Sequence, residues 1–182
     1  MRSLIATLGL ALPLATHAAG FTLESAELKP GKPVPEQHVF KGFGCEGGNV
    51  SPSLAWKGAP KETRSFAVTV YDPDAPTGSG WWHWVVFNLP ADTTALAAGA
   101  GDAAAGKAPK GAVQSRTDFG RPGWGGPCPP KGDKPHRYVF TVHALKVDKL
   151  DLDENATAAL VGFMLNANRL GTASFTATYG RK

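Results

Sequence analysis

The 182-residue sequence lacks several features that would point to common classes of protein. Its two cysteines are too few for a cysteine-based structural zinc site, which usually takes four ligands. No run of lysine and arginine is interleaved with aromatic residues, and the net charge is only +4, so we expect no nucleic-acid partner. No serine lies in a recognisable nucleophile elbow, and there is no internal repeat. Beyond the first residues, no apolar segment is long enough to span a bilayer.

The first 18 residues have the composition of a secretory signal peptide. Arg2 is the only charged residue before position 24, residues 4–15 are mostly apolar, and Ala18 suits a cleavage site. The apolar stretch is too short to cross a membrane, although a buried N-terminal helix or strand is an alternative. We therefore expect residues 1–18 to be removed and residues 19–182 to form a single domain, located in the periplasm or secreted.

The two cysteines, Cys45 and Cys128, both lie beyond the predicted signal peptide. An even count in an exported protein favours one disulfide, here closing a loop of about 83 residues. Loss of loop-closure entropy in the unfolded chain would make this crosslink worth on the order of 4–5 kcal/mol. The alternative is a pair of separate buried thiols.

Segments rich in β-branched and aromatic residues dominate the chain and predict strands. One helix is predicted from about Ala156 to Asn168, with Gly171 just past its end and Leu160, Phe163 and Met164 as its buried stripe. This balance predicts a mainly β protein, an antiparallel β-sandwich. The expected strands are residues 21–28, 65–71, 82–89, 137–145 and 175–179.

Residues 101–135 show little periodicity, and glycine and proline are frequent in the second half of this stretch. A loop of this length inside a compact domain usually has a function or is disordered. The prolines, together with Cys128, favour a fixed geometry. We therefore expect this segment to contribute to a functional site.

Three of the expected strands carry polar residues at the end of an apolar row. Side chains alternate between the two faces of a strand, so residues of equal parity share a face. A row of this kind would place its polar member at the rim of the sheet, next to the core. The expected rows are Phe66, Val68, Val70 and Asp72; His83, Val85 and Phe87; and His136, Tyr138, Phe140 and Val142.

These rows predict a pocket at one rim of the sheet. If the strand that ends at Asp72 pairs antiparallel with the strand that begins at His83, the two side chains are neighbours. His136 and Tyr138 would complete the lining. Taken singly, each histidine could be a hydrogen-bonded core residue, and Asp72, which precedes a proline, could form a turn.

Other polar residues are interpreted differently. Asp74 is expected to have a structural role through an ion pair with Arg137. His38 and His143 have no polar neighbours in the sequence, so we interpret both as ordinary surface or hydrogen-bonded histidines.

Three blocks in this order resemble the phosphatidylethanolamine-binding protein family: DPDAP at residues 72–76, the strand that begins at His83, and GPCPPKG at 126–132 together with HRY at 136–138. The region of Cys45 with NVSP at 49–52, and the predicted export, are similar to the bacterial, Raf kinase inhibitor-like branch of that family. The resemblance covers nearly all of the chain after the signal peptide.

The resemblance implies a β-sandwich with a C-terminal helix, short peripheral helices and a small anion-binding pocket. In the family, residues matched by Asp72, His83, His136 and Tyr138 line this pocket, and the proline matched by Pro130 borders it. Family members bind phosphate-like groups, including phospholipid head groups, and several regulate kinases or other partners. An exported protein does not meet cytosolic kinases, so that partner is not carried over, while regulation of another protein partner stays open.

The chemistry of these residues suits an anion. Protonated imidazoles and the Tyr138 hydroxyl would donate hydrogen bonds, with Asp72 holding a histidine charged, and loop N–H groups could add more. Binding would then weaken as the pH rises through the histidine pKa values. We expect a binding protein without cofactor or metal rather than an enzyme. A hydrolase using Asp72 and the histidines, a metal site, and a protease or kinase inhibitor acting through the rim loops remain alternatives.

Overall fold

The computed structural model describes residues 20–182, and the predicted signal peptide lies outside the described residues. Among these residues there is one α-helix, α1 (Ala158–Asn168), and one 3₁₀ helix, η1 (Glu36–His38). No helix in this part of the chain has the length and apolar character to cross a membrane. The strands are β1 (Thr22–Glu24), β2 (Lys41–Gly42), β3 (Cys45–Glu46), β4 (Leu54–Lys57), β5 (Ser65–Asp72), β6 (Trp81–Pro90), β7 (Ala95–Leu96), β8 (Val113–Gln114), β9 (His136–Leu145) and β10 (Arg169–Tyr179).

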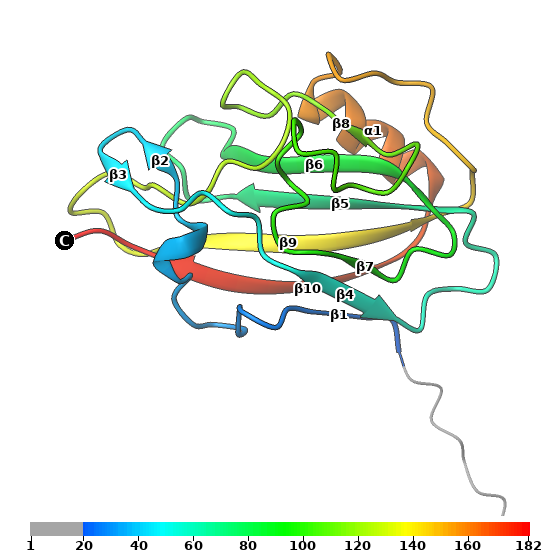
Figure 1. The fold of residues 1–182 in the computed structure, drawn as a ribbon, viewed down its shortest axis with the longest axis horizontal. Helices are drawn as coiled ribbons and strands as arrows, with labels where there is room; N and C mark the ends of the chain where they lie inside the picture. The colour runs from blue at the N-terminus through cyan, green and yellow to red at the C-terminus, as the bar shows by residue number, and fades with distance from the viewer. Residues whose placement is uncertain (1–19) are drawn as a thin grey trace, which may run out of the picture.

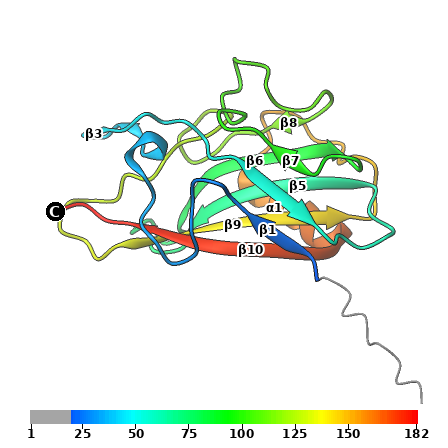
Figure 2. The same cartoon turned by 60° about the horizontal axis from the view of Figure 1, so that its bottom comes forward.

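The strands form two main sheets and a small hairpin. The larger sheet has the order β10-β9-β5-β6-β8, the smaller one has the order β1-β4-β7, and β2 pairs with β3. Neighbouring strands in all three are antiparallel. Figures 1 and 2 show the smaller sheet on one face of the larger sheet and α1 on the other. The prediction of a mainly β, antiparallel fold is therefore confirmed.

The two faces of the five-stranded sheet bury separate hydrophobic clusters. Alternation along β5 explains this, because Phe66, Val68 and Val70 pack toward the smaller sheet while Ala67 packs toward α1. The cluster facing the smaller sheet is the larger of the two and includes the fully buried Trp84. The central strands are thus covered on both faces, and the open ends of the sheet remain for a site.

The helix buries a different face from the one predicted. Its N-terminus is capped by the Thr157 side chain, which accepts a hydrogen bond from the N–H of Leu160. Leu160 and Phe163 are 45% and 67% exposed, so the predicted stripe is wrong for these two residues, whereas Met164 is partly buried against the cluster beneath the helix. The helix is apolar nearly all round, so periodicity does not select one face, and smaller side chains give the closer contact with the sheet. The buried residues are Ala158, Val161 and Leu165.

Several predicted boundaries also differ. β10 begins at Arg169, directly after the helix, so Gly171 lies in a strand, and the final strand predicted over residues 175–179 is present but begins earlier. This strand pairs along almost the whole of β9. The segment predicted over residues 21–28 contains only the three-residue strand β1. Several short peripheral helices were expected, and within residues 20–182 the only one is η1.

Candidate functional site

Antiparallel pairing brings the polar ends of the central strands together. Asp72 is the last residue of β5, and His136 is the first residue of β9. The rows predicted on these two strands are correct, because Val70 and Tyr138 lie in the same hydrophobic cluster and β5 pairs with β9. In Figure 1 the arrowhead of β5 points to this end of the sheet, where the β2–β3 hairpin and the C-terminus also lie.

His83 reaches the same place through an irregularity in β6. Val70 is paired with Trp84 and Tyr71 with Trp82, so His83 is an extra residue without a partner on β5. Such a β-bulge turns a side chain to the other face of the sheet. The row predicted for β6 is therefore wrong, because Val85 and Phe87 pack toward α1 while His83 lines the pocket.

The Asp72 carboxylate, which is 3% exposed as a residue, links two neighbours. Its Oδ2 atom lies 2.8 Å from Nδ1 of His136, and its Oδ1 atom accepts a hydrogen bond of 2.8 Å from the backbone N–H of Asp74. The second contact is the turn that an aspartate before a proline favours. Asp72 thus serves both as a turn residue and as a partner that orients His136.

His136 uses both of its ring nitrogens within the protein. While Nδ1 faces Asp72, Nε2 lies 3.4 Å from the carboxylate of Asp133. Asp133 lines a neighbouring surface depression and not the pocket shared by Asp72 and His83. His136 therefore forms part of the pocket wall without a ring nitrogen free to face a ligand.

Asp74 fastens the turn after β5 to the start of β9. Its carboxylate accepts hydrogen bonds from the backbone N–H of Arg137 at 2.8 Å, from Nε at 2.9 Å and from Nη2 at 2.7 Å. These hydrogen bonds from Arg137 lower the pKa of Asp74 to about 2. The predicted pairing is present, and it lies outside the pocket.

His83 is buried and uncharged near neutral pH. Burial lowers its pKa to about 4, although a carbonyl oxygen, that of Gly125, lies 2.6 Å from Nδ1. The ring packs edge-on against Phe119 and Tyr138, with centroid distances of 5.4 and 5.1 Å. Nδ1 must carry the hydrogen in order to donate to a carbonyl, so Nε2 is left as an acceptor. The expectation of a protonated imidazole is wrong for His83, because burial outweighs the nearby Asp72.

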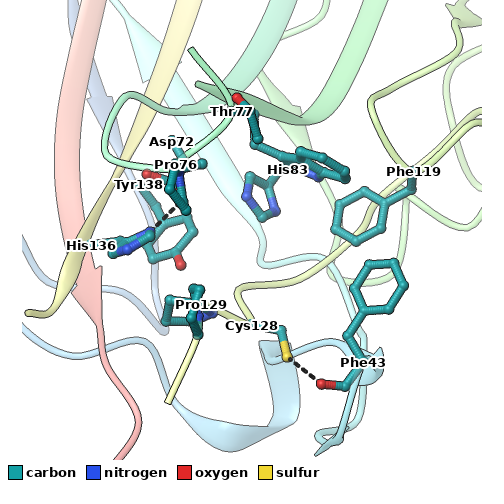
Figure 3. Close-up of a pocket in the computed structure, with 13 residues that line it drawn as sticks. Phe43, Asp72, Pro76, Thr77, His83, Phe119, Cys128, Pro129, His136 and Tyr138 are labelled. Carbon is teal, nitrogen blue, oxygen red and sulfur yellow. Dashed lines mark hydrogen bonds and ion pairs between the residues drawn. The ribbon is translucent and has the colours of Figure 1, made fainter. Parts of the chain in front are cut away.

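The Tyr138 hydroxyl is the unusual group of the site. Its oxygen is buried and has no hydrogen-bond partner within residues 20–182. Burial, followed by the charge of Asp72, raises the pKa of Tyr138 well above its ordinary value, so the hydroxyl keeps its proton. A buried hydroxyl without a partner costs about 1–3 kcal/mol. Figure 3 shows this oxygen directed between His83 and Pro129, into the pocket.

The glycines of the loop before Cys128 are needed for close packing. A Cβ atom on Gly125 would clash with the Phe119 ring, and one on Gly126 would clash with the backbone carbonyl of His38. Their N–H groups already donate, from Gly125 to the carbonyl of His83 and from Gly126 to the side chain of Asn49. The expectation that loop N–H groups bind the ligand is therefore wrong for these two glycines.

The disulfide between Cys45 and Cys128 is present, with sulfurs 2.06 Å apart, so that prediction is confirmed. It ties the loop carrying Pro130 to the β2–β3 hairpin and so fixes one wall of the pocket. The loop takes part in the pocket as the sequence predicts, but the sequence does not predict the pocket-lining rings of Phe43 in the hairpin and of Phe119.

The assembled pocket has a volume of about 170 Å³ and opens at the end of the sheet. All five predicted ligand-binding residues lie on it, while Arg137 and Asp74 do not. Within the part of the chain that is described, no three histidine, cysteine, aspartate or glutamate side chains form a group that could hold a metal ion. The lining is Phe43, Asp72, Ala75, Pro76, Thr77, Trp81, His83, Phe119, Cys128, Pro129, Pro130, His136 and Tyr138 (Figure 3).

Comparisons with known proteins found a matching family model and similar sequences. Residues 24–180 match the family model described as phosphatidylethanolamine-binding protein. The chain is 57% identical over 180 residues to UPF0098 protein YbcL of Escherichia coli, covering 98% of each chain. It is 34% identical over 165 residues to a Mycobacterium tuberculosis protein that is named a lipoprotein, LppC, covering 91% of this chain and 75% of that protein.

A solved structure also resembles the fold. The crystal structure of E. coli YbcL, described as a member of the mammalian PEBP family, superposes with a TM-score of 0.88 at 60% identity. The match covers 90% of this chain and 100% of the YbcL chain. The chain therefore belongs to the phosphatidylethanolamine-binding protein family.

Proposed function

We propose that the pocket binds the phosphoryl group of a small phosphate monoester, such as a free phospholipid head group. The observation that carries the proposal is the buried Tyr138 hydroxyl, which needs a partner that residues 20–182 do not supply. A phosphoryl oxygen is a strong acceptor for this donor. The neighbouring Nε2 atom of His83 is an acceptor, so it suits a P–OH group on the same ligand.

The charge of the lining favours a singly charged ligand. Among the described residues, no lysine or arginine lines the pocket, while the buried carboxylate of Asp72 does. A monoanionic phosphate monoester keeps one P–OH hydrogen for His83, and this hydrogen is lost as the pH rises through the second pKa of about 6. We therefore expect affinity to fall as the pH rises, because of the ligand's ionisation rather than that of His83.

Binding rather than hydrolysis suits the arrangement. Cys128 is held in the disulfide and has no thiol, and the Thr77 hydroxyl donates to the carbonyl of Gly80. Both oxygens of Asp72 are engaged, so this carboxylate is not free to activate a nucleophile. Release of phenol from phenyl phosphate measures hydrolysis. Turnover that disappears in His83→Gln would overturn the proposal of a binding protein.

We also propose that the protein is exported. The apolar residues 4–15 and the disulfide support this, because disulfides persist in oxidising compartments. The lipoprotein name of the mycobacterial relative agrees with an envelope location for that protein. N-terminal sequencing of the mature protein should begin near position 19. An intact Met1 in protein recovered from its own cells would contradict export by cleavage.

Calorimetric titration with methyl phosphate tests the proposed ligand chemistry. We expect one saturable site, and weaker binding of dimethyl phosphate, which has no P–OH hydrogen for His83. Removing a hydrogen bond to a charged ligand costs about 1.5–3 kcal/mol, so His83→Gln should weaken binding by roughly tenfold or more. His143→Gln, on the opposite face of the sheet, is the matched control and should leave the affinity unchanged. Absence of saturable binding, or equal affinity in His83→Gln, would contradict the proposal.

A further inference from the structure

The pocket is chemically divided into two halves. Tyr138, His83 and Asp72 form a polar side, and the opposite wall consists of aromatic rings. Figure 3 shows Phe119 and Phe43 facing this pocket from the side away from His136. Trp81 meets Phe119 edge-on with a centroid distance of 5.5 Å, which extends the aromatic wall. A phosphoryl group contacting the polar side would leave the aromatic wall free for another part of the ligand.

Phe43 has an exposed side chain and an unfavourable backbone conformation at the pocket. Its side chain is 71% exposed, the most exposed of the large hydrophobic residues in the described part of the chain. Its φ of 53° lies in the left-handed region, which a phenylalanine rarely adopts. Such outliers cluster at ligand sites, where the surrounding structure enforces them.

Several contacts enforce this position. The disulfide of Cys45 and Cys128 crosslinks the hairpin to the pocket loop. Arg181 Nη1 donates to the carbonyls of Phe43 at 3.3 Å and Pro129 at 3.2 Å, and Nη2 donates to Gly44 at 3.1 Å. The guanidinium thus joins the same two segments as the disulfide. The exposed ring is therefore a fixed part of the pocket rim.

The ring of Phe43 is also aligned with the rest of the wall. It lies nearly parallel to Phe119, at an interplanar angle of 11° and a centroid distance of 6.0 Å. Phe40 packs beneath both, with centroid distances of 5.2 and 4.6 Å. Offset and edge-to-face contacts with a further flat ring are favourable in such an arrangement. The wall thus presents fixed aromatic surface beside the polar groups.

The size of the pocket is consistent with a second ligand group. Its volume of about 170 Å³ is several times the roughly 30 Å³ that a water molecule occupies in the liquid, and a cavity of about 150 Å³ accommodates benzene. The space thus exceeds what a small inorganic anion fills. The remaining volume lies against apolar side chains.

Resting on the function proposed above, we infer that the pocket selects phosphate monoesters whose phosphoryl group is attached to a flat aromatic group. The phosphoryl group meets Tyr138 and His83, and the aromatic group lies against Phe43 and Phe119. Phe43 is then a residue that determines specificity, while the polar groups bind any small phosphoryl ligand.

Two phosphonates that differ only in the ring provide the test. Phenylphosphonate and methylphosphonate are titrated at the same pH into the wild-type protein, Phe43→Ala and Phe163→Ala. Phe163 is an exposed phenylalanine on α1, outside this pocket, and is the matched control. Burying much of a ring should make phenylphosphonate bind about tenfold more tightly than methylphosphonate. Phe43→Ala should reduce that preference to about threefold or less, and Phe163→Ala should retain it.

The outcomes separate the two proposals. Equal affinities of the wild-type protein for both phosphonates, or an unchanged preference in Phe43→Ala, would overturn the aromatic specificity and leave phosphoryl binding intact. If neither phosphonate binds, the proposed function itself is overturned. If phenol binds as tightly as phenylphosphonate, the phosphoryl group contributes nothing to binding, and the proposed function is again overturned. The aromatic wall would then still be a binding surface.

Discussion

The two faces of the five-stranded sheet bury histidines in different ways. His83 lies at the end of the sheet, beside Asp72 and Tyr138 and on the wall of the pocket. His143 lies in the middle of the pairing between β9 and β5, on the face covered by α1, with Nε2 3.0 Å from the Thr69 hydroxyl. Burial lowers the pKa of both histidines to about 4.

Similar burial and similar pKa values therefore do not distinguish a ligand site from a structural residue. At the pocket, a carboxylate, a second histidine and an unpartnered hydroxyl converge where strands end and a crosslinked loop closes over them. Beneath α1, His143 has one hydroxyl partner and no carboxylate in hydrogen-bonding contact. His83 belongs to a candidate site because it lies at the strand ends, where loops add further groups. His143 lies away from this end of the sheet. The following predictions test this contrast.

The largest expected effect comes from the crosslink, which is confined to the pocket end. Replacing both Cys45 and Cys128 by serine should lower the free energy of unfolding by about 2–5 kcal/mol. It should also weaken methyl phosphate binding, because the hairpin and the pocket loop lose their covalent link. Urea denaturation and calorimetry measure the two effects. Unchanged affinity in a folded double variant would show that the wall does not depend on the crosslink.

Next in size is the contrast between the buried pair and the isolated histidine. Asp72→Asn removes the carboxylate that faces Nδ1 of His136 and should lower the free energy of unfolding by about 2–3 kcal/mol, because a buried hydrogen bond to a carboxylate is stronger than one between neutral groups. His143→Gln loses one neutral hydrogen bond, and we expect about 1 kcal/mol. Chemical denaturation of the two variants side by side gives the comparison. Equal losses would mean that the pair is no more important than the single hydrogen bond.

A further expected effect concerns pH. In the folded protein His83 and His143 bind protons only near pH 4, whereas an unfolded histidine does so near 6.5. The stability that the two neutral rings contribute is therefore present above pH 6.5 and is lost as the pH falls through 4. Thermal unfolding across this window should show the decline. A stability that stays constant from pH 6.5 to 4 would contradict the burial of neutral rings.

Ligand binding should separate these two histidines. Methyl phosphate brings a negative charge next to His83, so it should raise the pKa of His83 in an NMR titration. The pKa of His143 should not move, because its ring lies on the other face of the sheet. Equal shifts of both rings would break the proposed contrast.

The smallest expected effect involves two ion pairs at the protein surface. Arg137→Gln should return the pKa of Asp74 from about 2 toward its ordinary 3.8, since the hydrogen bonds from Arg137 are the main cause of the shift. The stability that this carboxylate contributes above pH 4 and loses toward pH 2 should then decrease. An NMR titration of the Asp74 carboxyl group measures the change in its pKa. Arg64→Gln breaks the exposed pair with Asp148 and should leave Asp74 unaffected.

Much of the site could be predicted because β5 and β9 are regular strands. Asp72 and Tyr138 extend apolar rows, and period-two alternation was enough to place both at one rim. Alternation alone does not predict that His83 lies in the pocket, because its side chain is turned there by the β-bulge. The bulge depends on the register between β5 and β6, and this pairing is a property of two segments together.

Other features depend on contacts between segments far apart in the sequence. Phe43 stands among glycines in a short hairpin, and no periodicity marks it as a pocket residue. Gly125 is needed only because the Phe119 ring packs on it. The prediction of the buried face of α1 was wrong for a different reason. The helix is apolar nearly all round, so no periodic pattern distinguishes one face from another. Leu160 and Phe163 therefore looked as suitable for burial as Val161.

The most direct test of the central claim is the substitution Tyr138→Phe, measured for both stability and affinity. The hydroxyl has no partner within residues 20–182, so its removal should leave the free energy of unfolding unchanged or slightly raised. Loss of its hydrogen bond to the phosphoryl group should weaken methyl phosphate binding by roughly tenfold. Unchanged affinity in this variant, with or without a change in stability, would contradict the account.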